Sequence, residues 1–378
     1  MALGSTRFSR LLGVAIFFLL AALLLGCGGG SVTASFHSPP PGPRFAYVVN
    51  ETANNISAYS ANPTTGAVTP VAGSPFATEL VPALAAADPA GRFLFVANSG
   101  SDNVSGYRIN ATTGALTPVT GSPFATASTP VGVTVDPLGR FVYVSDHLAQ
   151  GISAYTLNAT TGTLTPVTGS PFATGMVPGV LAIERTGKFL YVANVSSNDV
   201  WGYSINQSTG ALTPVPGSPF PAGTQPFGVA IDPAGKSVYV SNFATADVSA
   251  YSINTSTGAL TPIAGSPFPA GTVPVSVAVD RTGSFVYVAN LRSNDVSVYM
   301  RNTTSGVLTP VAGSPFPTGT SPFSVTVDPS GKFVLTANLG SNDVSVFAVN
   351  TATGALTPVA GSPFPADLGP VAVVVVQK

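Results

Sequence analysis

Few side chains in this sequence of 378 residues could take part in chemistry, because only 8% of them are Asp, Glu, Lys or Arg. The chain has two histidines, His37 and His147, and one cysteine, Cys27. A single cysteine excludes an internal disulfide, and so few histidines and cysteines exclude a Cys/His zinc site. Acid–base chemistry would therefore have to come mainly from carboxylates and from the imidazoles of these two histidines.

The polar residues that stand out are those that depart from a repeated pattern. In seven equivalent places an apolar run ends in Asn or, once, in Asp146, and the residue after it varies. That residue is Glu51 in the first place and His147 in the third, and Arg292 comes one position later in the sixth. A carboxylate or an imidazole can activate water, and an arginine can hold an anionic substrate. We therefore predict Glu51, His147 and Arg292 as candidate catalytic residues.

Further departures are expected around the same site. Glu79 and Asp367 occupy one equivalent position in the segments that join the copies, and Phe227 and Phe323 begin apolar segments. Together with Asp146, these residues would form the rim of a ligand site. The alternative interpretation is that the polar ones are solvated loop residues without a chemical role.

A calcium site is another alternative, because Asn and Glu supply the oxygen ligands that Ca²⁺ prefers. Asn50, Asn194 and Asn290, together with Glu51, could provide them. However, the Asn recurs in all but one copy, which is typical of a residue that caps a turn. We therefore predict no metal and no cofactor.

These residues must be positioned by a 48-residue repeat, which runs without insertion from Phe45 to the end of the sequence. The seven copies begin at Phe45, Phe93, Phe141, Phe189, Ser237, Phe285 and Phe333. Each copy contains four segments rich in aromatic and β-branched residues, which predict strands. In the sixth copy the predicted strands are 285–289, 296–300, 308–311 and 323–327.

Two turn signals separate the predicted strands. One is an Asn followed four residues later by Gly, as in Asn302 and Gly306, and the other is Asp-Pro-x-Gly, as in 328–331. Gly supplies a positive φ, and Asn or Asp bonds the backbone of a tight turn. Four strands in a repeat of this length predict one propeller blade. The fold class is therefore all-β, a seven-bladed β-propeller with four antiparallel strands per blade.

The residues of the repeat also carry a family resemblance. Tyr-Val-Ala-Asn at 287–290 and Ser-Asn-Asp-Val-Ser-Val at 293–298 resemble the YVTN type of propeller repeat. The Gly-Ala-Leu-Thr-Pro stretch and the Asp-Pro-x-Gly-Lys turn are similar to the lactonase-type propellers, whose members resemble bacterial 6-phosphogluconolactonase. The resemblance covers 45–378 and implies the opening of a lactone, with Asn50-Glu51 matching an Asn-Glu pair of the family. The family's histidine-bearing inner strands have no counterpart, because the equivalent stretches read Pro-Ala-Leu at 82–84 and Pro-Val-Gly at 130–132.

The resemblance also implies how the ring closes. The chain would begin with the second strand of a blade, at Phe45, and end with an innermost strand, Val371 to Val376. That last strand should pair with the strand at Phe45 and complete one blade from both ends of the propeller. Closure leaves no open sheet edge, which removes a route to aggregation.

The first residues predict export. Arg7 and Arg10 precede an apolar run at 11–25, which is short for a membrane span. Leu-Leu-Gly-Cys at 24–27 resembles the bacterial lipoprotein box, in which the cysteine is lipidated. We therefore expect a signal peptide at 1–26, a lipidated Cys27 with a tether at 27–44, and the propeller at 45–378. The alternative, an uncleaved anchor, also places the protein on a membrane outside the cytoplasm.

Charge limits the partners. The net charge is −1, and it is −3 without Arg7 and Arg10, with no basic patch in the sequence. We therefore expect no nucleic acid partner. The predicted function is a monomeric binding scaffold of the cell envelope for a small molecule or an envelope protein. The alternatives are a lactone hydrolase and a purely structural envelope protein.

Overall fold

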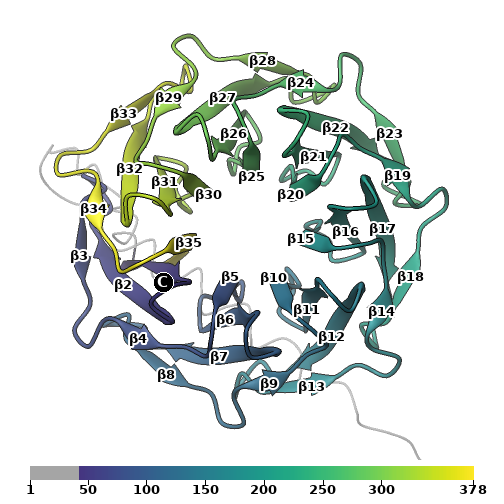
Figure 1. The fold of residues 1–378 in the computed structure, drawn as a ribbon, viewed down its shortest axis with the longest axis horizontal. Helices are drawn as coiled ribbons and strands as arrows, with labels where there is room; N and C mark the ends of the chain where they lie inside the picture. Colours follow the sequence, from purple (N-terminus) through teal and green to yellow (C-terminus); the bar gives the residue numbers. More distant parts are fainter. Residues whose placement is uncertain (1–41) are drawn as a thin grey trace, which may run out of the picture. The chain divides into compact units, whose positions relative to one another are not determined.

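The computed structural model describes residues 42–378, which form seven five-stranded sheets set as blades around a central channel (Figure 1). The predicted signal peptide, Cys27 and most of the predicted tether lie outside these residues. The seven-bladed prediction is confirmed. Among the described residues, no helix has the length and apolar character needed to span a membrane.

Each blade repeats the same strand order from the channel outwards. The innermost strands are β35 (Pro370–Gln377), β5 (Pro82–Ala87), β10 (Pro130–Val135), β15 (Pro178–Ile183), β20 (Pro226–Ile231), β25 (Pro274–Val279) and β30 (Pro322–Val327). The second strands are β1 (Arg44–Asn50), β6 (Phe93–Asn98), β11 (Phe141–Asp146), β16 (Phe189–Asn194), β21 (Ser237–Asn242), β26 (Phe285–Asn290) and β31 (Phe333–Asn338). The third strands are β2 (Asn55–Ala61), β7 (Asn103–Ile109), β12 (Gly151–Leu157), β17 (Asp199–Ile205), β22 (Asp247–Ile253), β27 (Asp295–Arg301) and β32 (Asp343–Val349).

The outer edge of each blade is shared by two short strands, both paired with the third strand. The fourth strands are β3 (Val68–Pro70), β8 (Leu116–Pro118), β13 (Leu164–Pro166), β18 (Leu212–Pro214), β23 (Leu260–Pro262), β28 (Leu308–Pro310) and β33 (Leu356–Pro358). The fifth were not predicted: β4 (Phe76–Ala77), β9 (Phe124–Ala125), β14 (Phe172–Ala173), β19 (Phe220–Pro221), β24 (Phe268–Pro269), β29 (Phe316–Pro317) and β34 (Phe364–Pro365).

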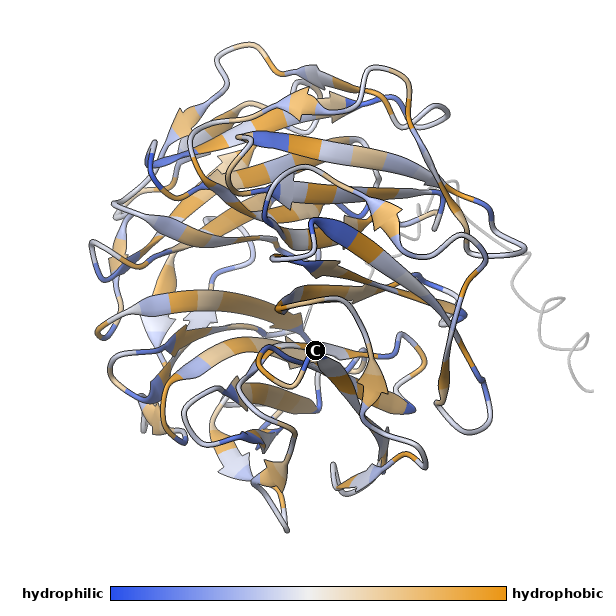
Figure 2. Cartoon of the chain, turned by 45° about the vertical axis from the view of Figure 1, so that its right-hand side comes forward, coloured by the Kyte–Doolittle hydropathy of each residue, from blue (hydrophilic) through white to orange (hydrophobic). Residues whose placement is uncertain are grey.

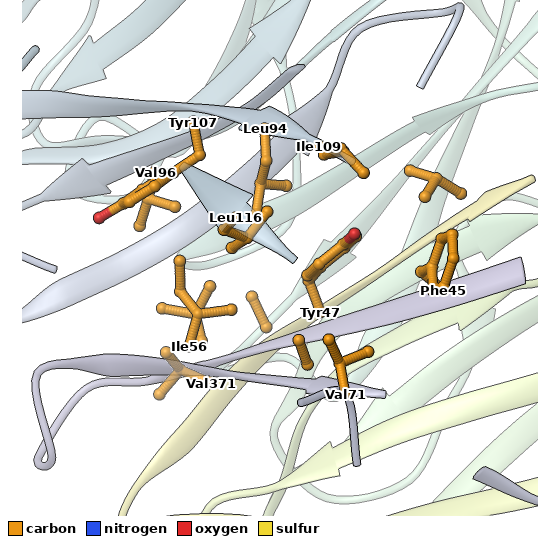
Figure 3. Packing of buried hydrophobic residues seen from close by; sticks show 14 residues of the cluster. Phe45, Tyr47, Ile56, Val71, Leu94, Val96, Tyr107, Ile109, Leu116 and Val371 are labelled. Atoms are coloured by element: carbon orange, nitrogen blue, oxygen red, sulfur yellow. The ribbon is translucent and has the colours of Figure 1, made fainter. Parts of the chain in front are cut away.

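The core lies between the blades, because each hydrophobic cluster joins two neighbouring sheets. Phe45 and Tyr47 of β1 pack with Leu94 of β6 and Leu116 of β8, as Figure 3 shows. The second strands are buried along their whole length, since each has a sheet on both sides. Figure 2 shows the result as orange segments within the strands and blue ones at turns and strand ends.

Tyrosine hydroxyls fasten neighbouring blades at two levels. Tyr47 Oη donates to the carbonyl oxygen of Gly114 at 2.8 Å, and Tyr107 Oη donates to that of Ala77 at 2.7 Å. The first bond recurs in three further copies, from Tyr143, Tyr191 and Tyr239, and the second recurs in every copy except the last. A buried hydroxyl needs such a partner, so the repeated tyrosines serve the ring rather than a ligand.

The ring closes as predicted. β35 pairs antiparallel with β1, with Phe45 opposite Val376. Arg44, the first residue of β1, donates to Asp328 of the preceding blade at 2.7 Å, and both side chains are buried. The strands of the described residues and the contacts that close the ring therefore lie within residues 43–378.

The two faces of the ring carry different connections. The loop face holds 51–54, which join β1 to β2, the blade-joining segment 78–81, and their equivalents in the other blades. The turn face holds 88–92, which join β5 to β6, 110–115, which join β7 to β8, and their equivalents. At the turn face, Asp328 accepts from the amides of Lys332 and Phe333, both at 2.9 Å, as predicted for this turn.

Candidate functional site

The two sets of connections on the loop face touch each other through the backbone. The amide of Glu51 donates to the carbonyl of Gly369 at 2.7 Å, and the amide of His147 donates to that of Thr129 at 2.9 Å. The same bond recurs in the other blades, for instance from Ser99. The polar departures predicted from the sequence therefore do lie on one face.

The repeated Asn is a structural residue. Asn50 Nδ2 donates to Asn55 Oδ1 at 2.8 Å and to Ser57 Oγ at 2.9 Å, which ties the second strand to the third. Asn290 does the same, donating to Asp295 at 2.6 Å. Four copies have an aspartate as the acceptor of this bond, and each of these aspartates therefore ties the third strand to the second: Asp199, Asp247, Asp295 and Asp343. Within residues 42–378, no cluster of three His, Cys, Asp or Glu could hold a metal ion.

Asp146 replaces this Asn in the third blade and reverses the direction of the bond. In its ionised form it has no hydrogen to donate, and it accepts from the amide and the hydroxyl of Ser153 at 3.0 and 2.7 Å. Gly151 stands where the other copies have Asn or Asp, so Asp146 has no side-chain partner at that position. Burial raises the pKa of Asp146 to about 6, although the bonds from Ser153 oppose this shift. Asp146 is thus a buried titrating group rather than part of an open rim.

The three candidate catalytic residues lie on the first, third and sixth blades. Glu51 is half-buried, and burial raises the pKa of its carboxyl group. His147 is half-buried, with Nδ1 3.1 Å from the carbonyl oxygen of Pro178. Arg292 is exposed. Among the described residues, no hydrogen bond or ion pair joins any two of these three side chains.

Asp367 and Glu79 lie at equivalent positions in the segments that join one blade to the next. Asp367 accepts from Asn55 Nδ2 at 2.7 Å, so it belongs to the network of Asn50. Glu79 lies near Tyr107, whose pKa is raised mainly by burial and further by the charge of Glu79. Both are half-buried, and neither is in contact with Glu51, His147 or Arg292 through a hydrogen bond.

The channel holds a cavity of about 140 Å³ lined by the innermost strands. Its walls are apolar apart from two serines. The lining residues are Leu84, Ala85, Val133, Val180, Phe227, Val275, Ser276, Phe323, Ser324, Ala372 and Val373. Phe227 and Phe323, predicted as part of a rim, meet edge to face with ring centroids 5.9 Å apart. Gly179 makes room for Phe227, since a Cβ there would lie 3.1 Å from its ring.

The two serines of the cavity, Ser276 and Ser324, were not predicted from the sequence. Ser276 Oγ accepts from the amide of Val325 at 3.2 Å, and Ser324 Oγ accepts from that of Val373 at 3.1 Å. Each hydroxyl hydrogen is therefore left to donate to a ligand. The available signal was a Ser at the third position of an innermost strand, where the other copies have Gly or an apolar residue.

A family model for lactonases with a seven-bladed β-propeller matches residues 33–133, 119–224, 215–318 and 315–374. The chain belongs to this family. No curated protein matches the sequence. The match confirms the resemblance to lactonase-type propellers that was based on the Gly-Ala-Leu-Thr-Pro stretch and the Asp-Pro-x-Gly-Lys turn.

Solved structures with the same fold include two candidate 6-phosphogluconolactonases. The protein of Bacteroides uniformis is 21% identical, with a TM-score of 0.78 over 88% of this chain and 99% of the other. The protein of Bacteroides fragilis is also 21% identical, with a TM-score of 0.78 over 92% and 100%. A periplasmic gluconolactonase of Pseudomonas aeruginosa is 20% identical, with a TM-score of 0.73 over 88% and 99%. At such identities the likeness establishes the fold of this lactonase-family chain.

Proposed function

We propose that this lactonase-family propeller is a ligand-binding scaffold of the cell envelope, with its ligand at the loop-face end of the channel. The observation that supports this function is the apolar cavity of about 140 Å³ with two serine donors. Apolar walls with a few placed polar groups are typical of small-molecule sites. The candidate acid–base residues, in contrast, are not joined to one another.

The lining indicates the chemistry of the ligand. An apolar portion would pack on Phe227 and Phe323, and an oxygen acceptor would bind the hydroxyl groups of Ser276 and Ser324. A small lactone with an alkyl or phenyl substituent meets both requirements. Anionic sugars fit less well, because no charged side chain lines the cavity.

Thermal unfolding with a panel of such lactones tests this proposal. A ligand that binds only the folded state raises its melting temperature, by roughly 5 °C near saturation. Phe227→Leu should abolish the rise, because it removes one face of the aromatic pair. Phe243→Leu is the matched control, since Phe243 is exposed on the loop face and outside the cavity. No rise for any panel member, or equal rises in wild type and Phe227→Leu, would contradict the proposal.

Lactone hydrolysis is the second candidate function. It is favoured by family membership and by the raised pKa of the Glu51 carboxyl group, which suits a general acid or base. The fold neighbour named as a periplasmic gluconolactonase suggests an aldonolactone as the first substrate to try. Hydrolysis should exceed background and fall at least tenfold in Glu51→Gln and His147→Ala, as general acid–base groups contribute about 10²–10⁴. Equal turnover by wild type and variants would exclude these residues as catalysts.

The envelope location rests on the predicted lipidation of Cys27 and on the export signal before it. We propose a monomer held to a membrane by this lipid. Metabolic labelling with a radioactive fatty acid should mark the wild-type protein and leave Cys27→Ser unmarked. Label in both proteins, or in neither, would refute the anchor.

A further inference from the structure

The basic side chains of residues 42–378 gather on one face. Twelve of the fourteen Lys and Arg lie in this range, because Arg7 and Arg10 precede it. Arg292 is the one on the loop face. The other eleven are on the turn face: Arg44, Arg92, Arg108, Arg140, Arg185, Lys188, Lys236, Arg281, Arg301, Lys332 and Lys378. The expectation of no basic patch is therefore wrong, because the repeat brings basic residues that are far apart in sequence to equivalent positions.

The acidic side chains are divided in the opposite way. Six of the fifteen are on the turn face, and all six are buried: Asp88, Asp136, Glu184, Asp232, Asp280 and Asp328. The other nine are on the loop face: Glu51, Glu79, Asp102, Asp146, Asp199, Asp247, Asp295, Asp343 and Asp367. Counting side chains alone, the turn face carries +5 (11 − 6) and the loop face −8 (1 − 9).

The surface of the turn face is therefore cationic. Lys188, Lys236 and Lys332 occupy one equivalent position, the residue before the second strand of their blades, and all three are exposed. None of their ammonium groups has an ion-pair partner within residues 42–378. Arg185 and Arg281 add two further exposed cations in the same turns. The buried carboxylates beneath them are held by backbone amides, so they shape the turns and present no anion at the surface.

We propose that the turn face docks on an anionic phospholipid surface. Basic groups near such a surface are attracted to it, and the negative loop face is repelled. The opposite charges of the two faces thus fix one orientation, with the turn face down and the channel mouth of the loop face in solvent. The chain enters β1 at Arg44 on the turn face, so any anchor that precedes Arg44 would join the propeller on its membrane side. Docking involves the face opposite the proposed ligand site and does not depend on lipidation of Cys27.

Vesicle sedimentation tests the proposal. Residues 42–378 are used without the leader, because all strands and the closing contacts lie within them. The propeller should bind vesicles of phosphatidylglycerol and phosphatidylcholine and should not bind pure phosphatidylcholine. Binding should weaken as salt rises, since the Debye length falls from about 30 Å at 0.01 M to about 8 Å at 0.15 M. The triple variant Lys188→Gln, Lys236→Gln, Lys332→Gln should bind roughly 100-fold more weakly, at about fivefold per charge.

A control with the same change in net charge separates position from total charge. Leu148→Glu, Ala149→Glu and Ala244→Glu place three negative charges on exposed positions of the loop face. This control should bind within about twofold of wild type. Equal losses in the two triple variants, or no binding to anionic vesicles at low salt, would overturn the proposal. Binding to a DNA duplex without binding to vesicles would overturn it as well and assign the face to nucleic acid.

Discussion

A paired departure in the fifth and sixth blades offers a sharp test of how the repeat is packed. Ser237 stands where the other six copies have Phe, and Arg301 stands where they have an aliphatic residue. The buried Arg301 side chain of the sixth blade reaches the serine that replaces the ring in the fifth. It contacts Ser237 Oγ at 3.1 Å, Tyr239 Oη at 2.8 Å and Asp232 Oδ2 at 3.1 Å. We predict that the two substitutions are energetically coupled.

The expected magnitudes follow from these contacts. Arg301→Ile removes one member of a buried ion pair, for which losses of about 3–5 kcal/mol are usual. We expect the lower end, about 3 kcal/mol, because Asp232 keeps the amides of Ala234, Lys236 and Ser237 as donors. Ser237→Phe alone forces a ring against the guanidinium and should cost about 1–3 kcal/mol. The double variant restores the pairing of the other blades and should lie within about 1 kcal/mol of wild type.

Urea unfolding followed by circular dichroism measures all four proteins. The losses in free energy of unfolding of the two single variants, added together, should exceed the loss of the double variant by at least about 2 kcal/mol. Coupling of this size is expected for residues in one hydrogen-bond network. Val349→Ile, at the position equivalent to Arg301 in the last copy, is the control and should change stability by less than about 0.5 kcal/mol. Additive losses of stability would refute the reasoning, because they would mean that Arg301 and Ser237 do not depend on each other.

Three further predictions concern the ring and its buried groups. Deleting 370–378 removes the closing strand, so the product should be insoluble or melt without cooperativity; a soluble product with a cooperative transition would contradict this. Burial raises the pKa of Asp146 to about 6, so the folded state binds more protons than the unfolded state, and stability should fall by about 3 kcal/mol as pH rises from about 4 to 6. Asp146→Asn should remove that part of the pH profile in urea titrations, whereas parallel profiles would exclude Asp146 as its source. Tyr107→Phe loses the bond to Ala77 and should cost about 1 kcal/mol by the same assay, with Phe347→Leu in the copy that lacks this hydroxyl testing packing alone; an unchanged midpoint for Tyr107→Phe would count against the bond.

The blades could be predicted from the sequence because the residue pattern of each strand recurs in all seven copies of the repeat. The third strand of the sixth copy was expected at 296–300 and runs from Asp295 to Arg301. The fifth strand, Phe316–Pro317 in that copy, was missed because two residues give no alternation to recognise. Its phenylalanine, Phe316, packs against the hydrophobic cluster that joins the sixth and seventh blades.

The site could be predicted only in part, because its residues come from different copies. Sequence spacing told which residues share a face, and the backbone bonds of Glu51 and His147 confirm that face. The spacing could not predict which side chains are in contact. Residues 48 positions apart lie in neighbouring blades, and the spacing does not give their distances across the channel. The pair of Phe227 and Phe323 and the serines of the cavity depend on side-chain length and direction across the channel. The opposite charges of the two faces were not predicted either. They depend on the end of a strand at which each charged residue lies, and the net charge does not contain that information.

Symmetry gives a physical criterion for where function lies in this chain. A residue that recurs in all seven copies meets seven similar surroundings, so it serves the blade and cannot distinguish one side of a small asymmetric ligand. Only departures from the repeat can do that, and the structure divides them into two kinds. In the first kind, one substitution compensates for another, so folding explains both. The examples are Arg301 with Ser237 and Gly151 with Asp146. Glu51 and Arg292 have no compensating substitution among the described residues, so they are the departures to test first for a role in binding or catalysis.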